Sequence, residues 1–226
     1  MKVVNRQNIE FLVDDNTENA SFWNLNDWES KNYSIIKDFS LKCTTFVNAG
    51  GWIGPFTLFA SELFQRVYSL EPDPIAFKEL KRNVELNKFI NVNLTNKALF
   101  DKSVSEISMG SNFGELGGSG TSIFQSDKSI KVPCITLKEF FSTNNIPPLQ
   151  SFLMLDTEGS EYILFDDVNF FETYKPIILI EFHIKFLNNE NYNHLITSLN
   201  NLKHLYKIDT EALKNKKIIH QLILPI

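Results

Sequence analysis

Carboxylates and an imidazole follow two apolar runs in the second half of the chain. The runs are residues 152–155 and 177–180. The polar side chains that follow them are Asp156, Glu158, Glu161, Glu181 and His183. Continuously apolar runs are typical of strands that are covered on both faces of a parallel sheet. Because ligands bind beyond the carboxyl ends of such strands, we expect these side chains to share one site.

This combination of side chains suits the removal of a proton from a hydroxyl group. The candidate catalytic residues are Asp156, His183 and Glu158, with either Asp156 or His183 as the base. Glu158, Glu161 and Glu181 would orient the molecule that loses the proton. An acidic neighbour raises the pKa of an imidazole and burial lowers it, so the sequence leaves the choice of base open.

The same acids are also candidate metal ligands. Asp156, Glu158 and Glu181 could offer oxygen atoms to a divalent cation that acidifies a hydroxyl group. Carboxylates alone do not define a coordination geometry, so a divalent cation is not favoured and no metal site is predicted. Cys43 and Cys134 show neither CxxC spacing nor a nearby histidine cluster, and we expect both to be reduced thiols.

A glycine-containing turn in the first half of the chain predicts a nucleotide cofactor. Residues 48–54 are Asn-Ala-Gly-Gly-Trp-Ile-Gly. This segment fits both a dinucleotide-binding turn and the D-x-G-x-x-x-G turn of a methyltransferase with Asn in place of Asp. Glu71 follows at the end of the next predicted strand, where a carboxylate can accept both ribose hydroxyls. The candidate cofactor-binding residues are Asn48, Gly50, Gly51, Trp52, Gly54, Glu71, Pro72, Asp101 and Asp156.

Strands and helices alternate from Thr44 onward, which predicts an α/β fold with a mostly parallel sheet of about seven strands and helices on both faces. Proline suits the first position of the helices at Pro55 and Pro74, and Asp73 can cap the second of them. Thr136 and Glu139 have the spacing of a capping box. The predicted strands are 44–47, 66–70, 92–94, 105–109, 130–133, 151–155, 177–180, 205–208 and 218–224. For the apolar tail 220–226 we favour an edge strand over a dimer contact, and the oligomeric state stays open.

Length, composition and charge favour a single soluble domain and disfavour a nucleic-acid-binding or membrane protein. The chain has 226 residues, enough for one α/β domain at 41–226 after a lead-in at 1–40, which we expect to be non-periodic and to pack as a lid. A net charge of −5 disfavours a nucleic-acid partner. No apolar run is long enough to span a membrane, and no signal peptide is evident, so a cytoplasmic location is expected.

Six segments of the chain form a recognisable set. They are N-A-G-G-W-I-G, L-E-P-D-P-I-A-F-K-E-L-K-R-N-V-E-L-N, N-K-A-L-F-D, I-T-L-K-E-F, L-M-L-D-T-E-G-S-E and I-L-I-E-F-H. Together they resemble the FkbM type of S-adenosylmethionine-dependent methyltransferase. The resemblance covers about Glu29 to His183, with departures at Asn48, where an acid is usual, and at Met154, where Lys often precedes the D-x-E-G element.

The resemblance implies a Rossmann-like class I methyltransferase fold that binds S-adenosylmethionine across the Gly50–Gly54 turn and Glu71. It also implies methyl transfer to a hydroxyl oxygen of a sugar or another small natural product. Asp101 is a candidate acceptor for the adenine edge. Trp23 and Trp28 are expected to close the acceptor pocket, with the loop Gly110–Ser122 as a mobile lid.

Two other functions remain open from the sequence. An NAD(P)-dependent oxidoreductase or epimerase would use the same Glu71, but would ordinarily supply a Tyr-x-x-x-Lys pair or a separate substrate domain. A non-catalytic cofactor-binding relative is the second, because Asn48 and Met154 depart from the family pattern. Loss of cofactor binding in Glu71→Ala, with loss of turnover alone in Asp156→Ala and His183→Ala, would separate the three.

Overall fold

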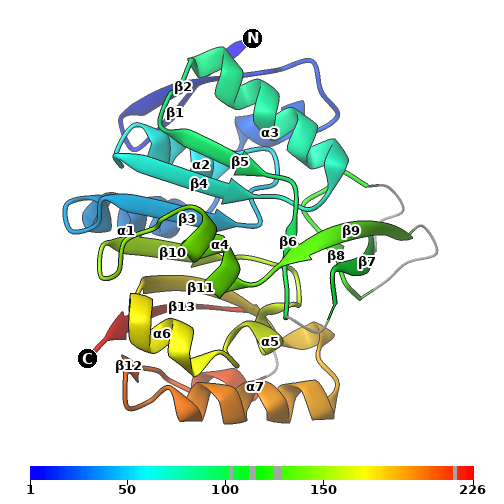
Figure 1. The fold of residues 1–226 in the computed structure, drawn as a ribbon. Helices are drawn as coiled ribbons and strands as arrows, with labels where there is room; N and C mark the ends of the chain where they lie inside the picture. The colour runs from blue at the N-terminus through cyan, green and yellow to red at the C-terminus, as the bar shows by residue number, and fades with distance from the viewer. Residues whose placement is uncertain (102–103, 112–115, 125–128, 216–217) are drawn as a thin grey trace.

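The computed structural model describes residues 1–226 apart from 102–103, 112–115, 125–128 and 216–217, and its main element is a seven-stranded sheet (Figure 1). The strand order is β12 (Tyr206–Lys207), β13 (Ile218–Pro225), β11 (Ile177–His183), β10 (Ser151–Leu155), β3 (Thr45–Ala49), β4 (Arg66–Leu70) and β5 (Val92–Thr95). The five strands from β11 to β5 are parallel, and β13 runs antiparallel to both of its neighbours. The predicted mostly parallel α/β sheet is confirmed.

Alternate residues of the central strands face two separate hydrophobic cores. On β3, Phe46 packs into one core and Val47 into the other, and both are fully buried. The first core is covered by α1 (Ser30–Ser40), α2 (Pro55–Ser61) and α3 (Pro74–Asn87). The second is covered by α4 (Leu137–Thr143), α6 (Val168–Tyr174) and α7 (Asn189–Asn201). Helices therefore cover both faces of the sheet, and the strand ends are left for a site.

The first forty residues have regular structure, so the prediction of a non-periodic lead-in was wrong. They form the hairpin β1 (Lys2–Arg6) and β2 (Ile9–Val13), the 3-10 helix η1 (Ala20–Asn24) and α1. Val4 and Phe11 point inward from the hairpin and are buried in the same core as Phe46. The inward residues alternate with exposed ones, which is the period-2 pattern of a half-buried strand. This segment thus contributes to the core.

A second, smaller sheet lies at the edge where the parallel strands end (Figure 1). Its order is β6 (Ala98–Leu99), β9 (Ser129–Ile135), β7 (Glu106–Ser111) and β8 (Thr121–Ser122). The excursion predicted between the third and fourth parallel strands is therefore a sheet of its own. It brings residues from the middle of the chain above the strand ends.

Helix caps form at the predicted positions. The side chain of Asp73 accepts hydrogen bonds from the backbone N–H groups of Ile75 and Ala76, at the start of α3. Thr136 and Glu139 form both bonds of the capping box that begins α4. The acid-bearing loop after β10 leads into the short helix α5 (Glu161–Leu164).

The apolar tail was predicted as an edge strand, and this was wrong. β13 pairs with β11 on one side and with β12 on the other, so β12 is the edge. The remaining short helices are η2 (Ile184–Phe186) and η3 (Ala212–Asn215). Among the described residues, no helix is both long enough and apolar enough to cross a membrane.

Candidate active site

A cavity of about 320 Å³ lies at the carboxyl edge of the parallel strands. It is lined from the ends of β3, β4 and β10, from the small sheet, and from the segment before α1. The predicted site residues that line it are Gly50, Trp52, Glu71, Pro72, Asp156 and Glu158. The cavity therefore lies at the sheet edge where the strand order predicts a site.

The glycine turn packs so closely against the end of β10 that it cannot carry a side chain at Gly50. This residue has φ +89°, and a Cβ atom there would lie 1.7 Å from the carbonyl oxygen of Asp156. The Asp156 N–H group donates in turn to the carbonyl of Ala49. The turn thus places bare backbone at the cavity wall, which is what close approach of a ligand requires.

Glu71 presents its carboxylate to the cavity with both oxygens already oriented. Oε2 accepts from the backbone N–H of Trp52 at 2.7 Å, and Oε1 accepts from the backbone N–H of Asp73 at 2.8 Å. Burial raises the pKa of Glu71 to about 7 despite these bonds. Each oxygen keeps a lone pair, so the carboxylate can still accept from two neighbouring hydroxyls, as a ribose diol requires.

Four predicted cofactor residues do not line this cavity. Asn48 is almost fully buried beneath the turn, where its Nδ2 donates to Thr57 Oγ1 at 3.1 Å and its Oδ1 has no hydrogen-bond partner. Gly51 and Gly54 shape the turn, because a Cβ atom on either would collide with a side chain of the strand or helix behind it. Asp101 borders a different cavity, so the structure does not support its predicted contact with the adenine edge.

The predicted catalytic residues do come together, around His183. Its Nδ1 lies 3.2 Å from Glu161 Oε1, and its Nε2 lies 3.3 Å from Glu158, 3.6 Å from Glu181 and 3.8 Å from Asp156. The imidazole is 2% exposed and stacks on Phe186. The acids Asp156, Glu158 and Glu181 line the cavity, while His183 lies behind them.

Burial and neighbouring charges shift the pKa values of the histidine and of the acids around it. Burial lowers the pKa of His183, but the hydrogen bond to Glu161 and the charges of Asp156 and Glu158 raise it more, to about 9. Burial and the neighbouring acids raise the pKa of Glu158 to about 7 and that of Asp156 well above its usual value. At neutral pH the imidazole therefore already holds its proton, whereas Glu158, with a pKa of about 7, is in part ionised and can accept one.

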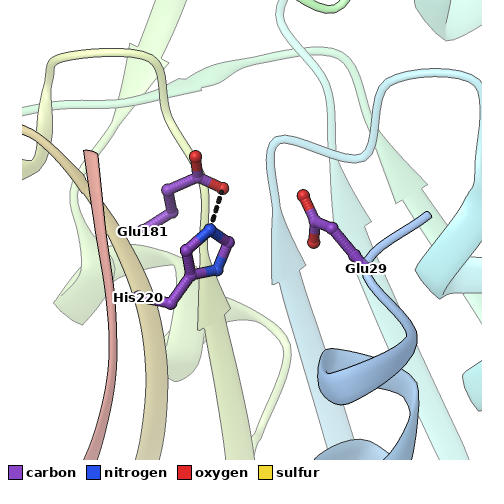
Figure 2. Close-up of side chains that lie close together, drawn as sticks. All are labelled: Glu29, Glu181 and His220. Atoms are coloured by element: carbon purple, nitrogen blue, oxygen red, sulfur yellow. Dashed lines mark ion pairs between the residues drawn. The ribbon is translucent and has the colours of Figure 1, made fainter. Parts of the chain in front are cut away.

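Sequence reasoning missed a second group, formed by Glu29, Glu181 and His220 (Figure 2). His220 Nε2 lies 3.5 Å from Glu181, and Glu29 faces this pair from the other side. Asn32 Nδ2 lies 3.2 Å from His220 Nδ1 and also donates to Glu29. An amide N–H facing Nδ1 leaves the proton of a neutral imidazole on Nε2, which argues against Nε2 as a metal ligand. No local pattern marks Glu29, because it reaches the cavity through tertiary packing.

Aromatic rings form a further part of the cavity wall. Trp28 stacks on Phe56, and Phe22 packs edge-on against both Trp28 and Trp52. All four rings line the cavity, as predicted for Trp28. The prediction for Trp23 was wrong, because that side chain is 1% exposed and belongs to the hydrophobic core.

The predicted lid loop is only partly within the described residues, because 112–115 lie outside them. Its end, from Gly117 to Thr121, is hydrogen-bonded to Asp73 and Trp52, whose backbone N–H groups also donate to Glu71. Gly117 N–H donates to Asp73, and the Trp52 indole donates to the carbonyl of Gly117. Gly118, Ser119 and Thr121 line the cavity.

The Tyr-x-x-x-Lys pair that an NAD(P)-dependent oxidoreductase would use does not line the cavity. A Tyr-x-x-x-Lys spacing occurs at Tyr33 and Lys37 on α1. Tyr33 is fully buried in the core, and Lys37 donates to the carbonyl of Gln7. Neither residue lines the cavity, which argues against an oxidoreductase built on this pair.

The sheet order and the acidic residue at the end of the second parallel strand define a class I methyltransferase fold. Two solved structures share this fold. The first is an rRNA methylase from Streptococcus thermophilus, with a TM-score of 0.51 and 8% identity over 87% of this chain and 95% of that one. The second is described as an rRNA methylase from Clostridium thermocellum, with a TM-score of 0.51 and 14% identity over 87% of this chain and 94% of that one. A methyltransferase FkbM from Methylobacillus flagellatus also matches, with a TM-score of 0.47, 14% identity, 86% of this chain and 51% of that one. No curated protein sequence matches.

A family model described as the methyltransferase FkbM domain matches residues 53–208. The chain therefore belongs to the FkbM methyltransferase family, and it is an S-adenosylmethionine-dependent methyltransferase. The cavity fits this cofactor, because the Gly50 backbone and the oriented Glu71 carboxylate face the same space.

Proposed function

We propose that the protein transfers a methyl group to a hydroxyl oxygen of a small polar acceptor such as a sugar or a natural product. The observation that carries the proposal is that carboxylates and aromatic rings line the same cavity. The carboxylates are those of Asp156, Glu158 and Glu181, and the rings are those of Phe22, Trp28, Trp52 and Phe56. Aromatic faces pack against sugar rings, and carboxylates accept from their hydroxyls.

We infer that Gly50, Trp52, Glu71 and Pro72 bind the cofactor, with Asn48, Gly51 and Gly54 supporting the turn. When bound, S-adenosylmethionine supplies an electrophilic methyl group on a sulfonium and leaves as neutral S-adenosylhomocysteine. Methyl transfer forms the bond from carbon to the acceptor oxygen as the bond from carbon to sulfur breaks, and the hydroxyl proton goes to a protein base.

Glu158 is the base that the geometry favours. It lines the cavity, and its pKa of about 7 leaves a substantial ionised fraction at neutral pH. Its backbone is held at φ +51°, a strained conformation for a residue other than glycine, and such strain is concentrated at functional sites. Asp156 is the second candidate, because its Oδ1 is buried without a hydrogen-bond partner.

His183 then serves as a positioning residue. The sequence had left it open as one of two candidate bases, with Asp156 as the other. Its positive charge lies behind Asp156, Glu158 and Glu181 and keeps part of this acidic group ionised. Glu161 fixes the ring, because its carboxylate also accepts from the backbone N–H groups of Thr157 and Gly159.

The acidic cavity supports a small acceptor over a nucleic acid. Glu29, Asp156, Glu158 and Glu181 line it, whereas a phosphate backbone requires basic residues. The two rRNA methylases share the fold at low identity, and their acceptor is not transferred to this chain.

The experiment is methyl transfer from isotopically labelled S-adenosylmethionine to a panel of sugars, amino sugars and RNA, with the product examined by NMR. The proposal expects the label in an O-methyl group of a small acceptor. It expects Glu158→Gln to abolish transfer with cofactor binding retained, and Asp166→Asn, at an exposed pair with His194, to match the wild type. Label found only on nitrogen or only in RNA would overturn the proposal.

A further inference from the structure

The segment Gly117–Thr121, which we call the strap, is held beside Glu71 by hydrogen bonds on both sides of Gly117. The Gly117 N–H donates to Asp73, and the Gly117 carbonyl accepts from the Trp52 indole and, at 3.3 Å, from Asn19 Nδ2. Three strap residues line the cavity, namely Gly118, Ser119 and Thr121. A short segment held by both backbone groups of one residue has a defined position against whatever fills the cavity.

The first contact is made by Asp73, whose two carboxylate oxygens have different partners. Oδ1 accepts from Ile75 and Ala76 and caps α3. Oδ2 accepts from Gly117 N–H at 2.6 Å and from Thr121 Oγ1 at 3.0 Å. Asp73 is fully buried and does not line the cavity, so it acts on a ligand only through the strap and through its own N–H bond to Glu71.

The second contact is made by Trp52, in the glycine turn. Its indole Nε1 donates to the carbonyl of Gly117 at 2.9 Å, while its backbone N–H donates to Glu71. Gly117 itself has φ +95°, and a Cβ atom there would lie 2.8 Å from Ile75, so the strap can approach this closely only because the residue is glycine.

We propose that the strap is part of the cofactor-binding site, and that Asp73 and Trp52 are positioning residues that hold it there. The sequence predicts this loop as a lid over the acceptor, whereas we propose that its end contacts the cofactor. The same two residues orient the Glu71 carboxylate through their backbone N–H groups, so the strap and Glu71 are held by one set of contacts. This inference rests on the cofactor assignment and is independent of the acceptor.

Two substitutions separate the strap from the rest of the fold. Asp73→Asn keeps an oxygen that can cap α3, because Asn and Asp are equally good helix caps, but it replaces the acceptor of Gly117 and Thr121 with a donor. Trp52→Phe keeps an aromatic ring against Phe22 and removes the indole N–H together with part of the ring surface. Asp167→Asn is the matched control, because Asp167 caps α6 through Phe170 and lies away from the strap.

The test is calorimetric titration with S-adenosylhomocysteine, with no acceptor present. We expect the dissociation constant to rise about tenfold in Asp73→Asn and several-fold in Trp52→Phe, and to be unchanged in Asp167→Asn. Both variants release the same segment. The dissociation constant of the double variant should therefore rise by less than the product of the two single-variant increases.

Binding of S-adenosylhomocysteine at wild-type strength by Asp73→Asn or by Trp52→Phe would overturn the proposal. If Asp73→Asn failed to fold, Trp52→Phe, which leaves the cap of α3 untouched, would still decide it. Absence of binding to the wild type would instead contradict the cofactor assignment itself, so the two failures are distinguishable.

Discussion

His183 Nδ1 lies 3.2 Å from Glu161 Oε1, and both side chains are almost completely buried. A charged hydrogen bond in such surroundings favours the protonated imidazole. Glu161 is itself held by the N–H groups of Thr157 and Gly159, so the pair is a fixed part of the loop after β10. The loop that carries Asp156 and Glu158 is thus organised around a cation.

The first prediction concerns stability at alkaline pH. The pKa of His183 is about 9 in the folded protein against an ordinary value of 6.5, so the folded state binds the proton more tightly. This stabilisation is complete below pH 6.5 and is lost as the pH rises through 9. We expect the free energy of unfolding to fall across this interval by on the order of 3 kcal/mol in the wild type, and not in His183→Gln. Urea denaturation at several pH values measures both, and parallel curves would contradict the assigned charge.

The second prediction concerns the pH dependence of methyl transfer. With Glu158 as the base, the rate at saturating cofactor and acceptor should rise as the pH passes about 7, because the carboxylate must be ionised. In Glu158→Gln the rate should be at least about 100-fold lower, and it should no longer rise as the pH passes about 7. A wild-type profile that stays flat between pH 5.5 and 8.5 would remove Glu158 from this role.

The third prediction concerns backbone packing at the glycine turn. Gly50→Ala would place a methyl group 1.7 Å from the Asp156 carbonyl, so β3 and β10 must separate. We expect a loss of several kcal/mol in stability, seen as a melting temperature lower by at least about 10 °C. Gly118→Ala is the comparison, because a Cβ atom there meets nothing within 4 Å. Equal melting temperatures for the two variants would show that the turn is not packed as described.

The fourth prediction concerns Asn48, where an acid is usual in the family. Asn48 lies in a buried polar chain in which its Nδ2 donates to Thr57 and Thr57 donates to Ser69. Asn48→Asp would bury a carboxylate and break this chain. We therefore expect a loss of about 1–3 kcal/mol in stability with no gain in cofactor affinity. Tighter binding of S-adenosylhomocysteine by the variant would instead show that the departure weakens the site.

The sequence predicts the parts of the site that depend on local order. A strand, a glycine turn and a capped helix place Glu71 at a strand end by chain connectivity alone, and the apolar runs before Asp156 and Glu181 mark two adjacent strands. These features can be predicted because backbone direction in a parallel sheet decides at which edge a residue lies.

Other parts depend on packing between distant segments, which no local pattern encodes. Trp23 and Trp28 are close in sequence, yet one enters the core and the other lines the cavity. Glu29 meets Glu181 only after the segment before α1 folds across the sheet edge. The base could not be chosen from the sequence, because the pKa of His183 is the sum of opposing effects from burial and from acids on two strands.

We propose that the cavity at the sheet edge binds S-adenosylmethionine through Glu71. The most direct measurement is calorimetric titration of the wild type and Glu71→Gln with S-adenosylmethionine, S-adenosylhomocysteine, NAD and NADP. Glu139→Gln is the control, because Glu139 also accepts a backbone N–H bond but lies on another cavity. We predict micromolar binding of the two sulfur compounds alone, weakened at least about tenfold in Glu71→Gln and unchanged in Glu139→Gln. Binding of NAD or NADP, or sulfur-cofactor binding that is indifferent to Glu71→Gln, would contradict it.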